Sequence, residues 1–202
     1  MGTRERRQRE AAKRRKTILA AAKNLFWKQG YSRTTIPQIA RATELAPGTL
    51  YLYFPGKEAL YVELLFEGYD LLEKRLLAAA EASATRRPEA LIDAFFAFAK
   101  ENPEYFDIIF FLSRREGGIQ EEKFPPEKVS QLDARVDACK AVAAKALRAA
   151  GDRKGDKAHR RTVDAVWSMM SGVILFFQRE EGFGALAAEA KRVILRGVFG
   201  SR

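Results

Sequence analysis

One stretch, Thr34–Lys57 (T-T-I-P-Q-I-A-R-A-T-E-L-A-P-G-T-L-Y-L-Y-F-P-G-K), constrains the fold of this chain more than any other. Thr35 stands three residues before Gln38, which is the spacing of a capping box at the start of a helix. A second helix is expected over Pro47–Phe54, because proline supplies the fixed φ that suits a first helical turn. The stretch therefore predicts two short helices joined by a tight turn.

The second short helix has one buried and one exposed face. Helical spacing buries Leu50 and Phe54 and turns Gly48, Thr49, Tyr51 and Tyr53 toward solvent. A small residue, a hydroxyl and two phenols on a short exposed helix suit the major groove of DNA, where they can reach phosphates and base edges. The alternative is a plain helical hairpin in which the two tyrosines are half-buried packing residues.

The positive charge lies in the same part of the chain. Residues 1–57 hold 13 Lys and Arg against three acidic residues, whereas residues 58–202 hold 23 of each sign, so the net charge of +10 belongs to the first segment. This distribution favours a polyanionic partner for that segment. Eight of the basic residues lie in residues 3–16, which we interpret either as a solvated, partly disordered tail or as an arm that contacts phosphates.

An amphipathic helix from Lys16 to Gly30 completes a three-helix head. The strings A-A-K-N-L-F-W-K-Q-G-Y-S-R-T-T-I-P-Q-I-A and P-G-T-L-Y-L-Y-F-P-G-K-E-A-L resemble the DNA-binding head of the tetracycline-repressor (TetR) family. The matching positions are Phe26, Gly30, Tyr31, Thr34, Ile39, Ala40, Thr49, Leu50, Tyr51, Phe54, Lys57 and Leu60. The resemblance implies that operator DNA is contacted by Thr34, Thr35, Pro47, Gly48, Thr49, Tyr51, Tyr53 and Lys57.

Three positions depart from the family pattern. Glu44 stands in the turn where the family usually has glycine, and if φ is positive there it costs up to about 1 kcal/mol. Ala46 replaces the usual serine cap of the second helix, a loss of about 1 kcal/mol. Tyr53 stands where a histidine is common, and it can still donate to a phosphate.

The remainder of the chain predicts an all-α fold of about nine helices, with a helix-turn-helix head in residues 1–57 and a helical ligand-binding and dimerisation body in residues 58–202. A long helix from Gly56 to Ala82 spans roughly 40 Å and joins the two parts. Further helices are expected over 89–101, from 103, over 127–150, over 162–181 and over 183–199, with an irregular loop over 117–126.

The helix Thr162–Glu181 is apolar almost all round, so it must be covered on every face. One chain of this size seldom supplies that cover, and a second copy would. We therefore expect a two-fold homodimer whose interface contains Ala165, Ser168, Met169, Gly172, Phe176, Leu186, Val193 and Ile194.

Aromatic residues are dense in the body. Individually they suit a core, and together they suit a cavity for an apolar ligand, which the TetR resemblance also implies. The expected lining is Phe95, Phe98, Phe106, Phe110, Trp167, Met170 and Phe177, with Arg114 and Arg115 as cations that could meet an acidic head group. The predicted function is a TetR-type repressor that a small lipophilic effector releases from a palindromic double-stranded DNA operator.

Other classes of function lack the residues that they need. The chain has one histidine, His159, expected at the surface, and one cysteine, Cys139, expected to be an inert buried thiol in a reducing compartment. We expect no catalytic site, no metal, no cofactor, no membrane association and a cytoplasmic location. An enzyme for hydrophobic substrates and a peripheral membrane protein stay as alternatives. The second is disfavoured because the basic arm and the aromatic helices are far apart in the sequence.

Overall fold

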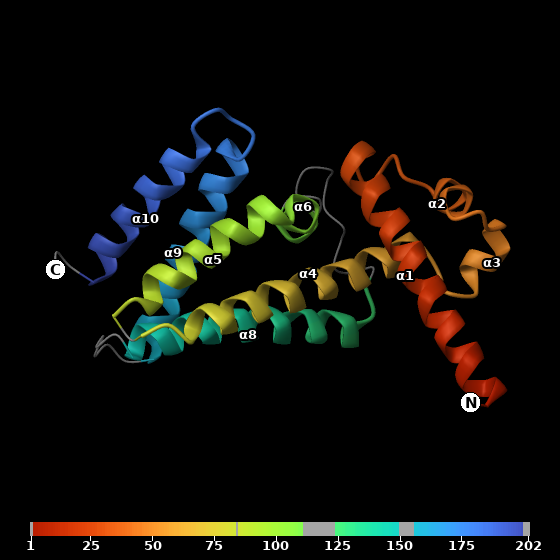
Figure 1. Cartoon of the computed structure of the whole chain (residues 1–202), viewed down its shortest axis with the longest axis horizontal. Helices are drawn as coiled ribbons and strands as arrows, with labels where there is room; N and C mark the ends of the chain where they lie inside the picture. The colour runs from red at the N-terminus through yellow and green to blue at the C-terminus, as the bar shows by residue number, and fades with distance from the viewer. Residues whose placement is uncertain (1, 84, 111–123, 150–155, 200–202) are drawn as a thin grey trace. The chain divides into compact units, whose positions relative to one another are not determined.

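The computed structural model describes residues 2–83, 85–110, 124–149 and 156–199 (Figure 1). These residues form helices and no strand, which confirms the predicted all-α fold. The helices are α1 (Thr3–Gln29), α2 (Ile36–Ala42), α3 (Pro47–Tyr51), α4 (Lys57–Ala80), α5 (Arg87–Glu101), α6 (Pro103–Phe110), α8 (Pro126–Ala149), α9 (Asp156–Phe177) and α10 (Phe183–Phe199).

The described residues fall into two compact units, one within 1–68 and 107–129 and the other within 69–106 and 130–202. The head boundary after residue 57 stays a prediction. Two helices differ in extent from their expected ranges. Helix α1 begins at Thr3 rather than near Lys16, so the basic arm is helical, and α3 ends at Tyr51 rather than at Phe54.

In the first unit α2 packs against α1, α3 packs against α2, and Tyr61 at the start of α4 meets Phe26 of α1. Ile18, Ala22 and Phe26 of α1 are fully buried, because they repeat on one face of the helix. Three aromatic rings close the end of this core, with centroids 5.3 Å apart for Phe26 and Tyr31 and 5.3 Å apart for Tyr31 and Tyr61. These tilted and edge-to-face pairs pack the start of α4 against the end of α1 and the residues that follow it.

The hairpin of α2 and α3 forms as its sequence predicts. The Thr35 hydroxyl accepts a hydrogen bond from the Gln38 backbone N–H, and the Gln38 side chain accepts one from the Thr35 N–H, which completes the capping box. Glu44 has φ = 55°, as the family departure suggested. Ala46 is the N-cap of α3 and gives it no side-chain hydrogen bond. Helix α3 is thus short and held chiefly by its neighbours.

The second unit is built around α5, α9 and α10, which pack against one another. The rings of Phe95 and Trp167 lie edge to face with centroids 4.9 Å apart, and the rings of Phe95 and Phe106 do so with centroids 6.1 Å apart. Two salt bridges from Lys191 on α10, to Glu89 at 3.2 Å and to Asp93 at 2.9 Å, join α10 to α5. Aromatic side chains of α5, α6 and α9 therefore pack against one another in this unit.

Candidate nucleic-acid interface

Helix α3 presents the exposed face that its sequence predicts. Leu50 is fully buried and Phe54 is 1% exposed, and these two side chains anchor α3 and the residues after it on the first unit. Pro47 and Gly48 are exposed, the Tyr51 phenol is 53% exposed, and Thr49 and Tyr53 are half-buried. The helix therefore offers hydroxyl donors and a small backbone profile to solvent.

Gly48 lies in open space. A Cβ added at this position would meet no atom within 4 Å, and its φ is not in the left-handed region. Neither packing nor backbone conformation within the chain requires glycine at this point. Glycine at this position leaves the backbone of α3 accessible, because no side chain stands between it and a second molecule.

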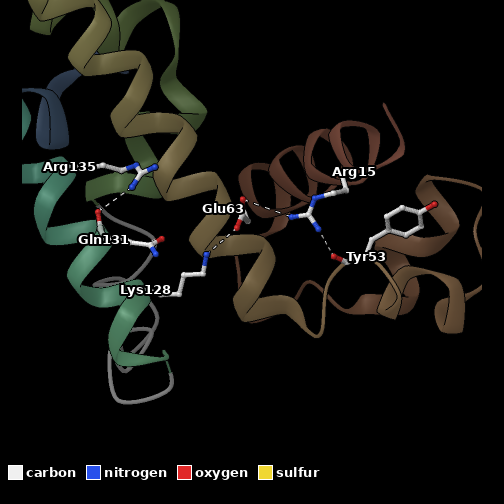
Figure 2. Close-up of polar contacts among 6 residues, drawn as sticks. All are labelled: Arg15, Tyr53, Glu63, Lys128, Gln131 and Arg135. Atoms are coloured by element: carbon white, nitrogen blue, oxygen red, sulfur yellow. Dashed lines mark hydrogen bonds and ion pairs between the residues drawn. The ribbon is translucent and has the colours of Figure 1, made fainter. Parts of the chain in front are cut away.

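Arg15 of α1 anchors the end of α3 (Figure 2). Its guanidinium donates to the Tyr53 carbonyl oxygen at 2.6 Å and lies 4.1 Å from the centroid of the Phe54 ring. A cation over a ring face and a charge-assisted hydrogen bond both favour this position. Arg15 thus ties the basic half of α1 to the residues that follow the exposed helix.

The same guanidinium approaches Glu63 of α4, at 3.9 Å, and Lys128 of α8 approaches the other oxygen of that carboxylate at 3.5 Å (Figure 2). Lys128 also lies 5.1 Å from the centre of the Phe66 ring. Both ion pairs are long and partly exposed, so each adds little stability. They do place Glu63 between the head and the first turn of α8.

Two predicted contact residues have partners within the chain. The Thr34 side chain is fully buried and its hydroxyl donates to the Gly30 carbonyl at 2.7 Å. A hydroxyl so placed cannot reach a phosphate, so the structure removes the Thr34 side chain from the predicted set. The Lys57 ammonium donates to the Tyr31 carbonyl at 2.8 Å and lies 4.2 Å from the Tyr31 ring centroid. It is half-buried and retains two further N–H donors.

Two residues beside this surface were not predicted from the sequence to belong to it. Leu52 is 84% exposed at the end of α3, where an apolar side chain is suited to a thymine methyl group. Its position between buried Leu50 and Phe54 is the signal that could have revealed it. Arg15 was counted in the arm, and no sequence pattern foretold its hydrogen bond to Tyr53.

The second unit contains a small apolar cavity of ≈ 60 Å³. Every residue in its described lining is apolar, and the lining includes Leu76, Phe95, Trp167 and Met170. Of the seven predicted lining residues, Phe95, Trp167 and Met170 are in it. The volume holds a few waters, whereas sites for drug-sized ligands measure about 300–1,000 Å³.

The other four predicted lining residues lie elsewhere. Phe98 and Phe106 are buried in the packed core, Phe110 is half-buried on α6, and Phe177 is 40% exposed. Helical periodicity marks an apolar face but does not tell a cavity wall from a packed core or from an uncovered surface. Arg114 and Arg115, and most of the loop expected over 117–126, lie outside the described residues.

The predicted dimer face is largely uncovered in the single chain. Met169 is 52% exposed, Phe176 69% and Val193 49%, and Ala165 and Ser168 are exposed as well. Gly172 and Leu186 are half-buried. Ile194 departs from the prediction, because it is 4% exposed and lines the cavity. Its side of α10 packs inward, while Val193 points to the other side.

The histidine and the cysteine are both buried. His159 is 2% exposed, which corrects the surface position predicted for it; it lies within α9, whose start at Asp156 was not foreseen. The Cys139 thiol is fully buried, and burial, with smaller contributions from Glu73 and Asp70, raises its pKa to about 12. A thiol of this kind is unreactive at neutral pH, as predicted. Among the described residues, no cluster of metal-ligating side chains occurs, and no helix is both long and apolar enough to cross a bilayer.

Comparison with known protein families identifies the family of this chain. Residues 18–64 match the bacterial regulatory proteins of the tetR family, and residues 89–198 match the tetracyclin repressor-like C-terminal domain. The chain belongs to the TetR family. Membership confirms the resemblance drawn from the sequence, and it places the chain among regulatory proteins rather than enzymes.

Individual relatives are HTH-type transcriptional regulators. The uncharacterized HTH-type transcriptional regulator YuxN of Bacillus subtilis is 39% identical over 62 residues, and the regulator QacR of Staphylococcus aureus is 46% identical over 48 residues. These matches span 31% and 24% of this chain, and 21% and 26% of the length of those two relatives.

Solved structures match over nearly the whole length. PfmR of Thermus thermophilus has a TM-score of 0.72 at 23% identity, over 89% of this chain and 97% of that one. FadR of Bacillus subtilis, solved in complex with stearoyl-CoA, has a TM-score of 0.70 at 16% identity, over 92% of this chain and 98% of that one. At such identities the likeness shows the fold.

Proposed function

We propose that this TetR-family chain is a transcriptional repressor that binds a palindromic DNA operator as a homodimer and leaves it when a small lipophilic ligand binds. The observation that carries the DNA-binding part is the exposed face of α3, with Gly48 in open space, on the segment that holds the whole excess of positive charge. A basic segment with a short helix free to enter a major groove is the arrangement of helix-turn-helix proteins.

The proposed contact set follows from exposure. Candidates to donate to phosphates or base edges are Thr35, Thr49, Tyr51, Tyr53 and Lys57, with Pro47 and Gly48 allowing close approach and Leu52 available to a thymine methyl group. Selection from a random duplex pool by the full chain tests this proposal. It should enrich one inverted repeat, and Tyr51→Phe should weaken binding to that repeat more than to random duplex. Failure to enrich any sequence would contradict it.

The exposed apolar residues on α9 and α10 support the homodimer. Met169 and Phe176 on α9 and Val193 on α10 are large apolar side chains exposed on two helices that pack together, and exposed apolar surface of this kind suits a protein partner. A second copy of the chain would cover them and would set the spacing of two α3 helices at about 34–36 Å or a multiple of it. Sedimentation equilibrium at micromolar concentration tests this, and a monomer would contradict it.

The cavity supports the lipophilic ligand. Its wholly apolar lining suits an aliphatic or aromatic group, and its ≈ 60 Å³ requires the surrounding helices to move apart when a larger ligand enters. FadR, a protein of the same fold, was solved with an acyl-CoA. A ligand can release DNA only if it binds the DNA-incompetent arrangement more tightly, typically by about 1–3 kcal/mol.

Helix α4 is the element that we propose to couple ligand and DNA. Leu76 near its end lines the cavity, and Lys57 at its start is bonded to Tyr31 of the head. Displacement of Leu76 by a ligand would therefore act on a continuous helix that begins at the DNA-binding surface.

Titration with decanol as the probe tests the ligand proposal, with Trp167 fluorescence as the binding signal and duplex anisotropy as the release signal. Leu76→Phe should reduce the cavity and weaken both decanol signals while duplex affinity without decanol is retained. Decanol binding that leaves duplex affinity unchanged would contradict the coupling.

A further inference from the structure

The basic residues before Arg15 form an ordered, exposed rod. Helix α1 starts at Thr3, and the side chains of residues 4–14 are all exposed, whereas burial on this helix begins at Ile18. Figure 1 shows this half of α1 extending past α3. Folding stability does not account for the rod, since an exposed helix rich in like charges gains little from packing and loses from repulsion.

Six basic residues of this part of α1 fall on two opposite faces of the helix. Arg4, Arg7 and Arg14 continue the stripe of Ile18, because 11 residues, or three turns, separate Arg7 from Ile18 and four separate Arg14 from it. The opposite face carries Arg9, Lys13 and Lys16. We call Arg4, Arg7 and Arg14 the inner stripe, and the other three the outer stripe. All six side chains are exposed, so the two stripes differ in direction and not in accessibility.

Arg15 shows which way the inner stripe points. It lies on the same side of the helix as Arg4, being 11 residues further along, and its guanidinium reaches the Tyr53 carbonyl at 2.6 Å, just after α3. The inner stripe therefore runs outward from the end of α3. From Arg15 to Arg4 it covers about 17 Å, which equals the axial length of about five base pairs.

We propose that the inner stripe is a second DNA-binding surface, which contacts the phosphate backbone flanking the base pairs that α3 reads. The inference rests on the proposed DNA-binding function and adds to it a longer footprint. Contacts of this kind hold affinity and register but carry no sequence information. The arm then raises affinity for any duplex that is long enough to reach it, and leaves the preference for one sequence to α3.

A pair of matched triple variants of the full chain tests the proposal. The inner variant is Arg4→Gln, Arg7→Gln and Arg14→Gln, and the outer variant is Arg9→Gln, Lys13→Gln and Lys16→Gln. Both remove three positive charges from the same helix, and glutamine preserves helix propensity. Circular dichroism checks that the helix content of both equals that of the wild type.

The DNA probes are the inverted repeat selected by the wild type, either trimmed to its ends or extended by ten random base pairs on each side. On the extended duplex the inner variant should weaken the salt dependence. The slope of log affinity against log salt, which is negative, should become shallower by about 2.7 for each protein chain, because three contacts contribute about 0.9 each. The outer variant should change this slope by less than the value of one contact, about 0.9. For both variants, the ratio of affinity for the selected duplex to affinity for random duplex should equal that of the wild type.

Equal effects of the two variants on the extended duplex would overturn the proposal, because long-range attraction does not distinguish faces. An inner-variant effect that is as large on the trimmed duplex would overturn it too, since the contacts would then lie within the repeat. A wild type that binds no duplex at all would refute the proposed function itself, which is a separate result.

Discussion

Replacing Glu44 with glycine should stabilise the protein. Glu44 lies in the turn between α2 and α3 with φ = 55°, the one residue other than glycine with a positive φ in the described part of the chain. Its side chain is exposed. In this region the Cβ of an L-residue approaches the following carbonyl oxygen, and glycine has no Cβ.

The magnitude is a difference of two opposing effects. Relief of the left-handed conformation contributes about 1–2 kcal/mol. Glycine also gives the unfolded chain more freedom, which costs about 0.4–1 kcal/mol. We expect a net gain of about 0.5–1 kcal/mol in the free energy of unfolding. For a chain of this size this corresponds to a rise in Tm of about 1–4 °C.

Urea denaturation at one fixed protein concentration measures the effect, because the stability of a dimer depends on concentration. Glu44→Ala is the matched control: it removes the same charge but keeps the Cβ and hence the strain. The glycine variant should exceed the alanine variant by at least about 0.5 kcal/mol with an unchanged m-value. A glycine variant no more stable than the alanine variant would show that the turn is not strained.

Three further results are expected. Gly48→Ala should fold at least as stably as the wild type, because alanine is the better helix former and the site is open. The same variant should bind duplex DNA more weakly. As a control, Gly184→Ala changes another open helical glycine and should leave duplex binding unchanged. Gly172→Arg should yield a folded monomer with no specific DNA binding, as seen by sedimentation, while Ser130→Arg should stay dimeric. The Cys139 thiol should resist Ellman's reagent at pH 8 in the native state and react at once in urea. Its folded pKa of about 12 exceeds the ordinary value of 9.0, so the stability that it contributes is complete below pH 9 and is lost as the pH rises toward 12.

Local rules predicted the helix-turn-helix well. The capping box at Thr35 and the proline at the start of α3 are short-range effects, and they appear as the sequence indicates. A positive φ at Glu44 was considered only because the family usually has glycine at this position, since nothing in the glutamate itself favours it. The TetR resemblance was recognised from the head alone, whereas the all-α fold was predicted from helical periodicity along the whole chain.

Predictions that required long-range packing were less complete. Ile194 and Val193 are neighbours on an apolar stripe, yet one lines a cavity and the other is exposed, which periodicity cannot distinguish. The helix in residues 3–15 was missed because nine of these thirteen residues are charged and the segment shows no apolar period. The buried Thr34 hydroxyl depends on the chain turn at Gly30, which brings a carbonyl within reach.

The salt dependence of duplex binding tests the central claim most directly. Wild-type protein is titrated into a labelled duplex of about 40 base pairs by fluorescence anisotropy, at several salt concentrations between about 50 and 300 mM. A head that neutralises at least about six phosphates predicts a slope of log affinity against log salt of about −5 or steeper. A slope near zero, or no binding at the lowest salt, would contradict the account of the first unit as a DNA-binding head.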